Sequence, residues 1–443
     1  MPKSNPCISN DGSASAAKDA IDPRAVKAPH PCHLPVLRGE GEDIRILALC
    51  DSPTVGTGFG RVSKNILERW HSYDGVSVDV WAINFEGWNY DQTPLRLFPA
   101  GLWNWNSNDK LNQFLRQLID GKYTHLWMLM DPHALSVGRF PQELHRRCKE
   151  HGIKVMLYYP ADAPLEREWL SILEAVDVAV TFTEYGKAET RKALGKSIYP
   201  IKVIPHGIDP VFRPLPEAER LKYRKMELVM SATTTIDFIK PDDFLIVNVN
   251  KNEWRKDPLR SLEIVKGLRE AGVPAKLVMR MQPHSAMGGI PLEVAAKQLG
   301  LTYGKEWVHI GEIPDEELCG LYNAADLYLT TSLGEGWGLG VTEALACHTP
   351  VAMANHTSLF EIGRLFTEPA RTIWLPLEDS TVCGADTRLR RRVHLADAVA
   401  AIKFAIEDKR VQRLAPSPSA LAYCNWEVIA KGMFKLLSKD GNI

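Results

Sequence analysis

The sequence has no cysteines in a C-x-x-C arrangement, although its 443 residues include eight cysteines. Scattered thiols of this kind are typical of a reducing compartment and do not indicate a disulfide framework. It also has no apolar run long enough to cross a bilayer, and its first 42 residues contain no apolar signal-peptide core. We therefore expect a cytoplasmic protein, in which a peripheral membrane contact would need only a surface patch.

A large excess of one charge is lacking as well. The chain carries 53 Lys and Arg against 54 Asp and Glu, a formal net charge of −1. This balance excludes a generally basic nucleic-acid binder but leaves room for a local basic patch. With 45% hydrophobic and 24% charged residues, the composition is that of a globular protein, and the length predicts about two domains.

Residues 1–42 are rich in Ser, Ala, Pro and Gly and predict a disordered tail. Two series of short apolar runs alternating with helical patterns follow, and such alternation predicts parallel sheets covered on both faces. We expect a Rossmann-like domain at 43–212, a second doubly wound domain at 213–424 and a last helix at 425–443. Strands are predicted at 44–50, 76–83, 125–130, 154–159, 178–182, 201–204, 244–249, 275–281, 307–310, 327–330 and 350–354.

The strongest motif is S-L-G-E-G-W-G-L-G-V-T-E-A-L-A at 332–346, in which Glu335 and Glu343 enclose three glycines. Glycines let a backbone approach a ligand closely, and the start of a helix favours an anion. Carboxylates accept hydrogen bonds from sugar hydroxyls. The motif therefore predicts a nucleotide-sugar site, whereas two solvated glutamates on a surface helix would leave the glycines unexplained.

A second motif, N-V-N-K-N-E-W-R-K-D-P at 248–258, begins at the end of a predicted strand. Its cations, Lys251, Arg255 and Lys256, are suited to holding a diphosphate. Taken alone, this motif would be a solvated turn. A third motif, H-I-G-E-I-P-D-E-E-L at 309–318, predicts a loop around Ile313 whose backbone reads a nucleobase edge, followed by a helix.

The first domain offers weaker signals. Gly56, Gly58 and Gly60 predict a flexible loop before a helix, with a simple tight turn equally favoured. Asp131 with His133, and Asp162, each follow a predicted strand and are candidates for a ligand-binding cleft between the two predicted domains. Asp131 is alternatively a helix cap. His206 near the domain junction is interpreted as structural. No carboxylate pair has Mg²⁺-like placement, so no metal and no resident cofactor are expected.

Together these motifs resemble the retaining family 4 glycosyltransferases of GT-B architecture. The resemblance runs over most of residues 44–437 and rests on G-T-G-F-G-R-V at 56–62, V-I-P-H-G-I-D at 203–209, W-R-K-D-P at 254–258, the motif at 309–318 and the E-x7-E signature at 335–343. It implies that Glu335 contacts the donor sugar, Glu343 the ribose, and Gly336, Trp337, Gly338 and Leu339 the sugar and phosphate. It also implies that Lys256 and Lys251 hold the diphosphate, with Gly58 and Gly60 approaching it from the other domain. The domain at 43–212 would then be the acceptor side, onto which the helix at 425–443 crosses back, and the domain at 213–424 would bind the nucleotide-sugar donor.

Two departures from the family pattern stand out. Lys251 occupies the place of an arginine, and Asp162 that of the family's cleft histidine, which leaves Asp162 as a catalytic candidate of undefined role. The resemblance implies transfer of a sugar, with retention, from a UDP- or GDP-sugar. A sugar-nucleotide epimerase, a phosphorylase and a non-catalytic binding protein are the alternatives. An epimerase would change the donor without any acceptor.

The acceptor is the least defined element. Aromatic residues are dense at 85–105, where Trp88 and Trp103 are acceptor candidates beside Asp131 and His133. With the basic run Arg388, Arg390, Arg391 and Arg392, they raise the hypothesis of a modified base in DNA as acceptor. We favour a packed aromatic loop and a solvated arginine turn, and a glycan or lipid-linked glycan as the acceptor.

Overall fold

The structure is a computed structural model that describes residues 44–87, 90–102, 104–195, 200–225, 227–231, 234–284, 288–367, 372–383 and 387–438. The tail predicted at 1–42 lies outside these residues. Within the described residues, no helix combines the length and the apolar composition needed to cross a membrane.

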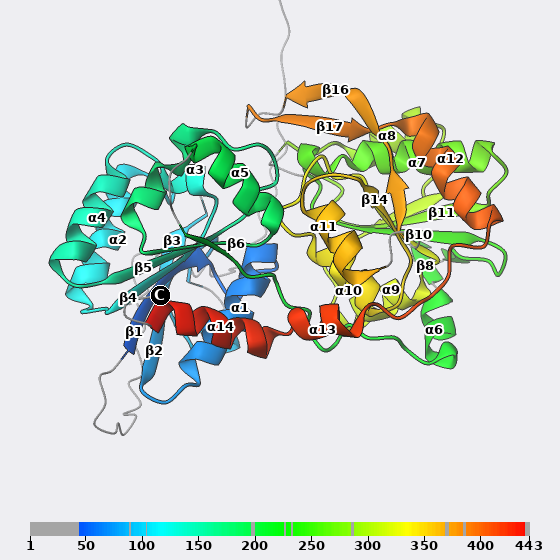
Figure 1. Cartoon of the computed structure of the whole chain (residues 1–443). Coiled ribbons are helices and arrows are strands. Elements are labelled where there is room, and N and C mark those ends of the chain that lie inside the picture. Colours follow the sequence, from blue (N-terminus) through cyan, green and yellow to red (C-terminus); the bar gives the residue numbers. More distant parts are fainter. Residues whose placement is uncertain are drawn as a thin grey trace, which may run out of the picture. The chain divides into compact units, whose positions relative to one another are not determined.

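The first half of the chain forms a seven-stranded parallel sheet in the order β3-β2-β1-β4-β5-β6-β7 (Figure 1). Its strands are β1 (Ile44–Asp51), β2 (Val76–Ile83), β3 (Arg96–Gly101), β4 (His125–Leu129), β5 (Lys154–Tyr159), β6 (Val178–Thr181) and β7 (Ile201–Val203). Alternate residues of β1 enter two different apolar cores: Ile46 and Ala48 join one, and Leu47 and Leu49 join the other. A strand whose two faces are both buried reads as a continuous apolar run, which is why β1 was visible in the sequence.

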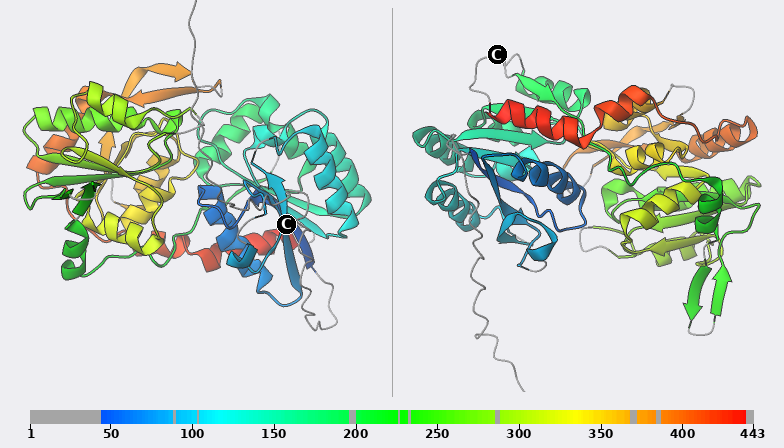
Figure 2. Two further views of the ribbon diagram at one scale, coloured as in Figure 1. Left: turned by 180° about the vertical axis from the view of Figure 1, so that it is seen from behind. Right: turned by 90° about the horizontal axis from the view of Figure 1, so that it is seen from below.

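Helices cover both faces of this sheet. Among the described residues, the helices that pack there are α1 (Gly58–His71), α2 (Asn108–Asp120), α3 (Pro132–Leu135), α4 (Phe140–Glu150), the 3₁₀ helix η2 (Arg167–Ala175), α5 (Glu184–Leu194) and α14 (Trp426–Ser438). The last of them returns from the far end of the chain and lies beside α1 (Figure 2). Trp70 Nε1 of α1 donates to the Ala430 carbonyl at 2.8 Å, and Trp127 Nε1 of β4 donates to Met433 Sδ at 3.2 Å.

The second half forms a six-stranded parallel sheet in the order β12-β11-β10-β13-β14-β15. Its strands are β10 (Phe244–Val249), β11 (Ala275–Arg280), β12 (Trp307–Ile310), β13 (Leu327–Thr330), β14 (Val351–Ala354) and β15 (Ile373–Leu375). The accompanying helices are α7 (Pro258–Glu270), α8 (Leu292–Gln298), α9 (Asp315–Ala324), α10 (Leu339–Ala346), α11 (Thr357–Phe366), α12 (Leu395–Glu407) and α13 (Pro418–Tyr423). The predicted class, two doubly wound parallel α/β sheets, is confirmed. The domain boundaries stay a prediction.

Two antiparallel hairpins were not predicted. The connector at 213–242 contains the expected helix, α6 (Glu217–Arg224), and also the hairpin β8 (Glu227–Ser231) and β9 (Thr234–Asp237). The second hairpin pairs β16 (Leu377–Cys383) with β17 (Leu389–Val393) and is drawn in orange in Figure 1. The preferred prediction of a solvated arginine turn at 388–392 was therefore wrong. Four arginines in five residues look solvent-exposed, but a strand turns alternate side chains to opposite faces.

Both sheets reverse their strand order at a defined point. The chain switches direction between β1 and β4 in the first sheet and between β10 and β13 in the second. Open α/β sheets bind ligands outside the carboxyl ends of the strands at such a switch point. The loops that follow these four strands carry the glycines at 56–60, Asp131 with His133, the motif at 248–258 and the motif at 332–346.

Candidate functional site

Loops from the carboxyl ends of both sheets line one cavity of about 840 Å³. Most of the predicted site residues lie on its wall: Gly58, Asp131, Asp162, Lys251, Arg255, Lys256, Ile313, Glu335, Gly336, Trp337, Gly338, Leu339 and Glu343. The lining does not include Gly60 or His133. The acceptor candidates Trp88 and Trp103 lie outside the described residues.

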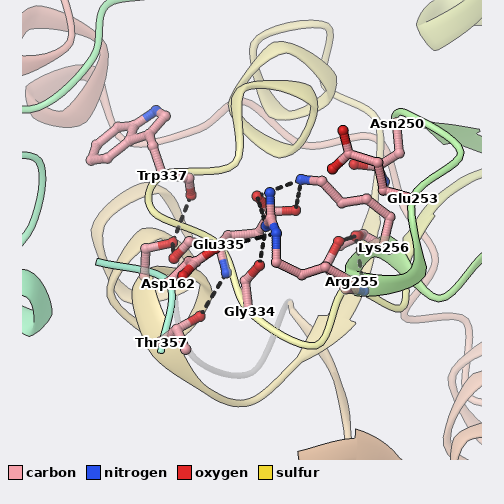
Figure 3. A network of polar contacts seen from close by, with 12 residues as sticks. Asp162, Asn250, Glu253, Arg255, Lys256, Gly334, Glu335, Trp337 and Thr357 are labelled. Atoms are coloured by element: carbon pink, nitrogen blue, oxygen red, sulfur yellow. Dashed lines mark hydrogen bonds and ion pairs between the residues drawn. The ribbon is translucent and has the colours of Figure 1, made fainter. Parts of the chain in front are cut away.

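At one end of the cavity, Glu335 meets two cations from the motif at 248–258 (Figure 3). Lys256 Nζ lies 2.6 and 2.7 Å from the two carboxylate oxygens of Glu335, and Arg255 lies at 3.7 Å. Arg255 also donates to the Gly334 carbonyl at 2.6 Å, which ties the two motifs together. Burial raises the pKa of Glu335, but the two cations outweigh burial and lower it, so the carboxylate is held ionised.

The glycine-rich segment between the two glutamates approaches its neighbours closely. Gly338 has a φ of 104°, which favours glycine, and it caps the start of α10. A Cβ at Gly334 would collide with the Asp162 carbonyl, and one at Gly336 with the side chain of Pro160. The Ser358 hydroxyl donates to the carbonyls of Glu335 and Trp337, both at 2.8 Å. These contacts hold the loop against the opposite sheet and aim the start of α10 at the cavity.

Glu343 lies on α10, farther along the chain than Glu335, and is 5% exposed. The Tyr322 hydroxyl donates to it at 2.8 Å, and Arg61 Nε lies 3.9 Å from its other oxygen. Burial dominates here and raises the pKa of Glu343. Arg61 comes from α1 and also binds Asp209 at 2.8 Å and Asp315. This arginine thus links α1 to the carboxylates at the Glu343 end of the cavity.

Asp162 sits among arginines. Arg388 and Arg390 contact its Oδ1 at 2.8 and 3.2 Å, and Arg255 lies 3.2 Å from its Oδ2. Burial raises the pKa of Asp162, but the guanidiniums outweigh burial and bring it to about 2. Arg388 also lies 2.9 Å from His133 Nδ1.

Asp131 lies close enough to be affected by Asp162, and the pKa of Asp131 is raised by burial and by that neighbouring charge. It is the N-cap residue of α3, but its side chain makes no cap hydrogen bond. Its carboxylate therefore lines the cavity without serving the helix.

The remaining predicted residues lie farther from the cluster around Asp162 and Glu335. Lys251 is 56% exposed on the cavity wall, and Glu253 lies 4.0 Å away. A Cβ at Gly60 would collide with the Val55 carbonyl, so this glycine permits the tight turn into α1. His206 is buried and lies 2.7 Å from the Tyr158 hydroxyl, while burial lowers the pKa of its imidazole to about 3. Among the described residues, no group of three or more His, Cys, Asp and Glu side chains is arranged to hold a metal ion.

Sequence reasoning missed Arg61 as a site residue and the inward role of Arg388 and Arg390. Arg61 was quoted only as the residue after the glycines of the loop at 56–60. The signal for the other two was the alternation in R-L-R-R-R-V at 388–393, which matches a strand with arginines on one face.

Comparisons with known proteins decide the family. The sequence model described as "Glycosyl transferases group 1" matches residues 235–364, the segment that carries Arg255, Lys256, Glu335 and Glu343. Over this segment, the chain is similar to this family. The resemblance to the retaining family 4 glycosyltransferases is thereby confirmed.

Curated proteins match parts of this chain. A D-inositol 3-phosphate glycosyltransferase from Corynebacterium jeikeium is 27% identical over 60% of the chain and 58% of its own length. A GDP-mannose-dependent alpha-(1-6)-phosphatidylinositol dimannoside mannosyltransferase from Mycobacterium tuberculosis is 30% identical over 28% of the chain and 30% of its own length. The chain thus spans less than two thirds of either relative.

The GT-B architecture is confirmed by solved structures. The structure of HepE from Anabaena, in complex with UDP and glucose, superimposes with a TM-score of 0.62 over 89% of this chain and 99% of its own. At 15% identity, this likeness establishes the fold alone.

Proposed function

We propose that this group 1 glycosyl transferase moves a hexose from a nucleotide-sugar to an acceptor hydroxyl, with retention at the anomeric carbon. The observation that carries the proposal is the pairing of Glu335 with Lys256 and Arg255 beside the start of α10, while Glu343 lies farther along the same helix. In this arrangement the sugar would contact Glu335, and the diphosphate would contact Lys256, Arg255 and the start of α10. The ribose would contact Glu343.

Catalysis in this arrangement is positioning and electrostatics. As the bond from the anomeric carbon to the diphosphate breaks, negative charge grows on the leaving oxygen. Lys256, Arg255 and the N–H groups at the start of α10 are fixed in a largely buried site, where they stabilise that charge without reorganising. Glu335 accepts hydrogen bonds from hydroxyls of the sugar and so fixes its orientation.

The donor we favour is GDP-mannose, because the Mycobacterium tuberculosis relative is described as GDP-mannose-dependent. UDP-glucose is the second donor to test, since HepE was solved with UDP and glucose. We propose a glycan or lipid-linked glycan as acceptor, a cytoplasmic location and turnover without a metal. The DNA hypothesis loses its main support, because the side chains of Arg388 and Arg390 are only 5% and 1% exposed.

Glu335→Gln and Lys256→Met separate the two predicted roles. GDP lacks the sugar, and the substitution removes a negative charge beside Arg255 and Lys256, so Glu335→Gln should bind GDP at least as tightly as the wild type does while losing at least about 100-fold in donor turnover. Lys256→Met should lose both GDP binding and donor turnover. Lys431→Met, on the exposed side of α14, is the matched control and should change neither.

Isothermal titration with GDP and proton NMR of GDP-mannose measure these two quantities. NMR also discriminates between the alternatives. Slow release of α-mannose indicates a retaining transferase using water, and a changed sugar on intact GDP would indicate an epimerase. Binding without any turnover, even with a panel of glycan acceptors, would indicate a non-catalytic protein and contradict the proposal.

A further inference from the structure

The hairpin strand β17, together with Arg388 directly before it, presents its arginines in alternation. Arg388, Arg390 and Arg392 turn inward, with side-chain exposures of 5%, 1% and 24%. Arg391 turns outward, is 45% exposed, and binds the Glu378 carbonyl and Asp379 within the hairpin. The two-residue period of a strand produces this division.

The inward arginines bind elements of both halves of the chain. Arg388 contacts Asp162 and His133 and stacks on the ring of Trp169 at 4.7 Å. Arg390 contacts Asp162 and stacks on Trp254 at 5.2 Å. Farther along, Arg392 binds Asp257, the residue that caps α7, at 2.5 and 2.8 Å.

The two oxygens of Asp162 are divided between two sources. Arg388 and Arg390 take Oδ1, and Arg255 faces Oδ2. Arg255 is at the same time the neighbour of Glu335 and one of the cations facing the proposed diphosphate position. The part of the Asp162 charge that Arg388 and Arg390 do not offset therefore acts directly on Arg255, a cation of the proposed donor site.

A count of charges shows the consequence. Among the described residues, the cations Arg255, Lys256, Arg388 and Arg390 lie beside Asp162 and Glu335, and the charges of Asp131 and Glu253 also act on this cluster. Removing Arg388 and Arg390 makes the net charge of this cluster more negative by two, at the place where an anionic diphosphate has to bind. Like charges in a poorly solvated site oppose binding strongly.

We propose that Arg388 and Arg390 are positioning residues of the donor site, which fix Asp162 and offset its charge so that Arg255 and Lys256 stay available to the donor diphosphate. The proposal rests on the proposed function of the cavity. It assigns to the β16–β17 hairpin a task in donor binding although neither arginine needs to touch the donor.

The test is a charge cycle measured by titration with GDP and with GDP-mannose. Arg388→Gln/Arg390→Gln should weaken GDP binding by about tenfold or more, and Arg391→Gln, on the opposite face of the same strand, should change it less than about twofold. Adding Asp162→Asn to the double variant removes the uncompensated carboxylate and should restore most of the lost affinity. Urea unfolding of the same variants separates this from a purely structural role, which predicts that GDP affinity changes only with the folded fraction.

Arg388→Lys/Arg390→Lys covers the case in which the glutamine variant does not fold. It keeps both charges and should retain GDP affinity within about threefold, although the planar fork is lost. GDP affinity in the glutamine variant equal to that of Arg391→Gln, or no recovery on adding Asp162→Asn, would overturn this inference alone. If the lysine variant has lost most of its GDP affinity while folded, the inference is overturned as well. A wild-type protein that binds neither GDP nor GDP-mannose would overturn the proposed function, and this inference with it.

Discussion

Replacing Lys256 by methionine should both destabilise the protein and abolish donor binding, and the size of the effect follows from the buried pair. The side chains of Lys256 and Glu335 are 12% and 10% exposed, and their charged atoms lie 2.6 Å apart. Removing one partner of a buried pair typically costs about 3–5 kcal/mol, because the other charge is left without compensation. Arg255 remains 3.7 Å from Glu335, so we expect the lower end, about 3 kcal/mol.

The double variant Lys256→Met/Glu335→Gln tests whether the pair acts as a unit. Its two substitutions together remove both charges, so the free energy of unfolding should recover to within about 1–2 kcal/mol of the wild type. Urea unfolding of the wild type, the two single variants and the double variant gives the coupling energy. Lys266→Met is the matched control, because Lys266 pairs with Glu270 at 3.7 Å on an exposed surface. It should cost less than about 1 kcal/mol.

Two outcomes would refute this reasoning. One is a Lys256→Met variant no less stable than Lys266→Met, which would mean that Glu335 is compensated by other groups. The other is strict additivity in the double variant. Donor affinity separates stability from function, because the double variant should be nearly as stable as the wild type and still bind GDP-mannose poorly.

Three further predictions concern other parts of the site. Glu343→Gln should weaken binding of GDP and of GDP-mannose equally, since its predicted contact is to the ribose that both contain; an effect on GDP-mannose alone would contradict that role in titrations. Gly334→Ala should lower the melting temperature and turnover because its Cβ collides with the Asp162 carbonyl, whereas Gly432→Ala on α14 should be neutral or slightly stabilising. His206 has a pKa of about 3 in the folded protein, below its unfolded value of about 6.5, so its contribution to stability is complete above pH 6.5 and is lost as the pH falls towards 3. The slope is up to about 1.4 kcal/mol per pH unit, and His206→Phe should flatten it in urea titrations between pH 4 and 7; an unchanged slope would mean that other groups cause it.

Much of the scaffold could be predicted from the sequence because its strands are buried on both faces. Such strands appear as continuous apolar runs, as β1 and β10 do. The edge strand β3 was missed because it carries mixed residues, R-L-F-P-A-G, and the edge strand β15 because it is only three residues long. The part of the site around Glu335 was predictable because the E-x7-E signature and the cations of the motif at 248–258 both follow strands at a switch point.

The arginines around Asp162 could not be placed in the same way. Arg388 meets a carboxylate 226 positions away, and Arg61 meets Asp315 across 254 positions. A basic run gives no indication of its distant partner, and isolated charges are usually solvated. Only the alternation within β17 distinguishes the inward from the outward arginines, and that pattern becomes informative once the segment is known to be a strand.

The central claim is that the cavity between the two sheets binds a nucleotide-sugar with its diphosphate at Arg255, Lys256 and the start of α10. A crystal structure of Glu335→Gln with intact GDP-mannose tests it most directly, since the variant should bind the donor while turning it over slowly. The account predicts the diphosphate within hydrogen-bonding distance of Arg255 and Lys256, the ribose at Glu343 and the mannose at residue 335. A donor bound elsewhere, or one whose ribose and sugar ends are reversed in this cavity, would contradict it.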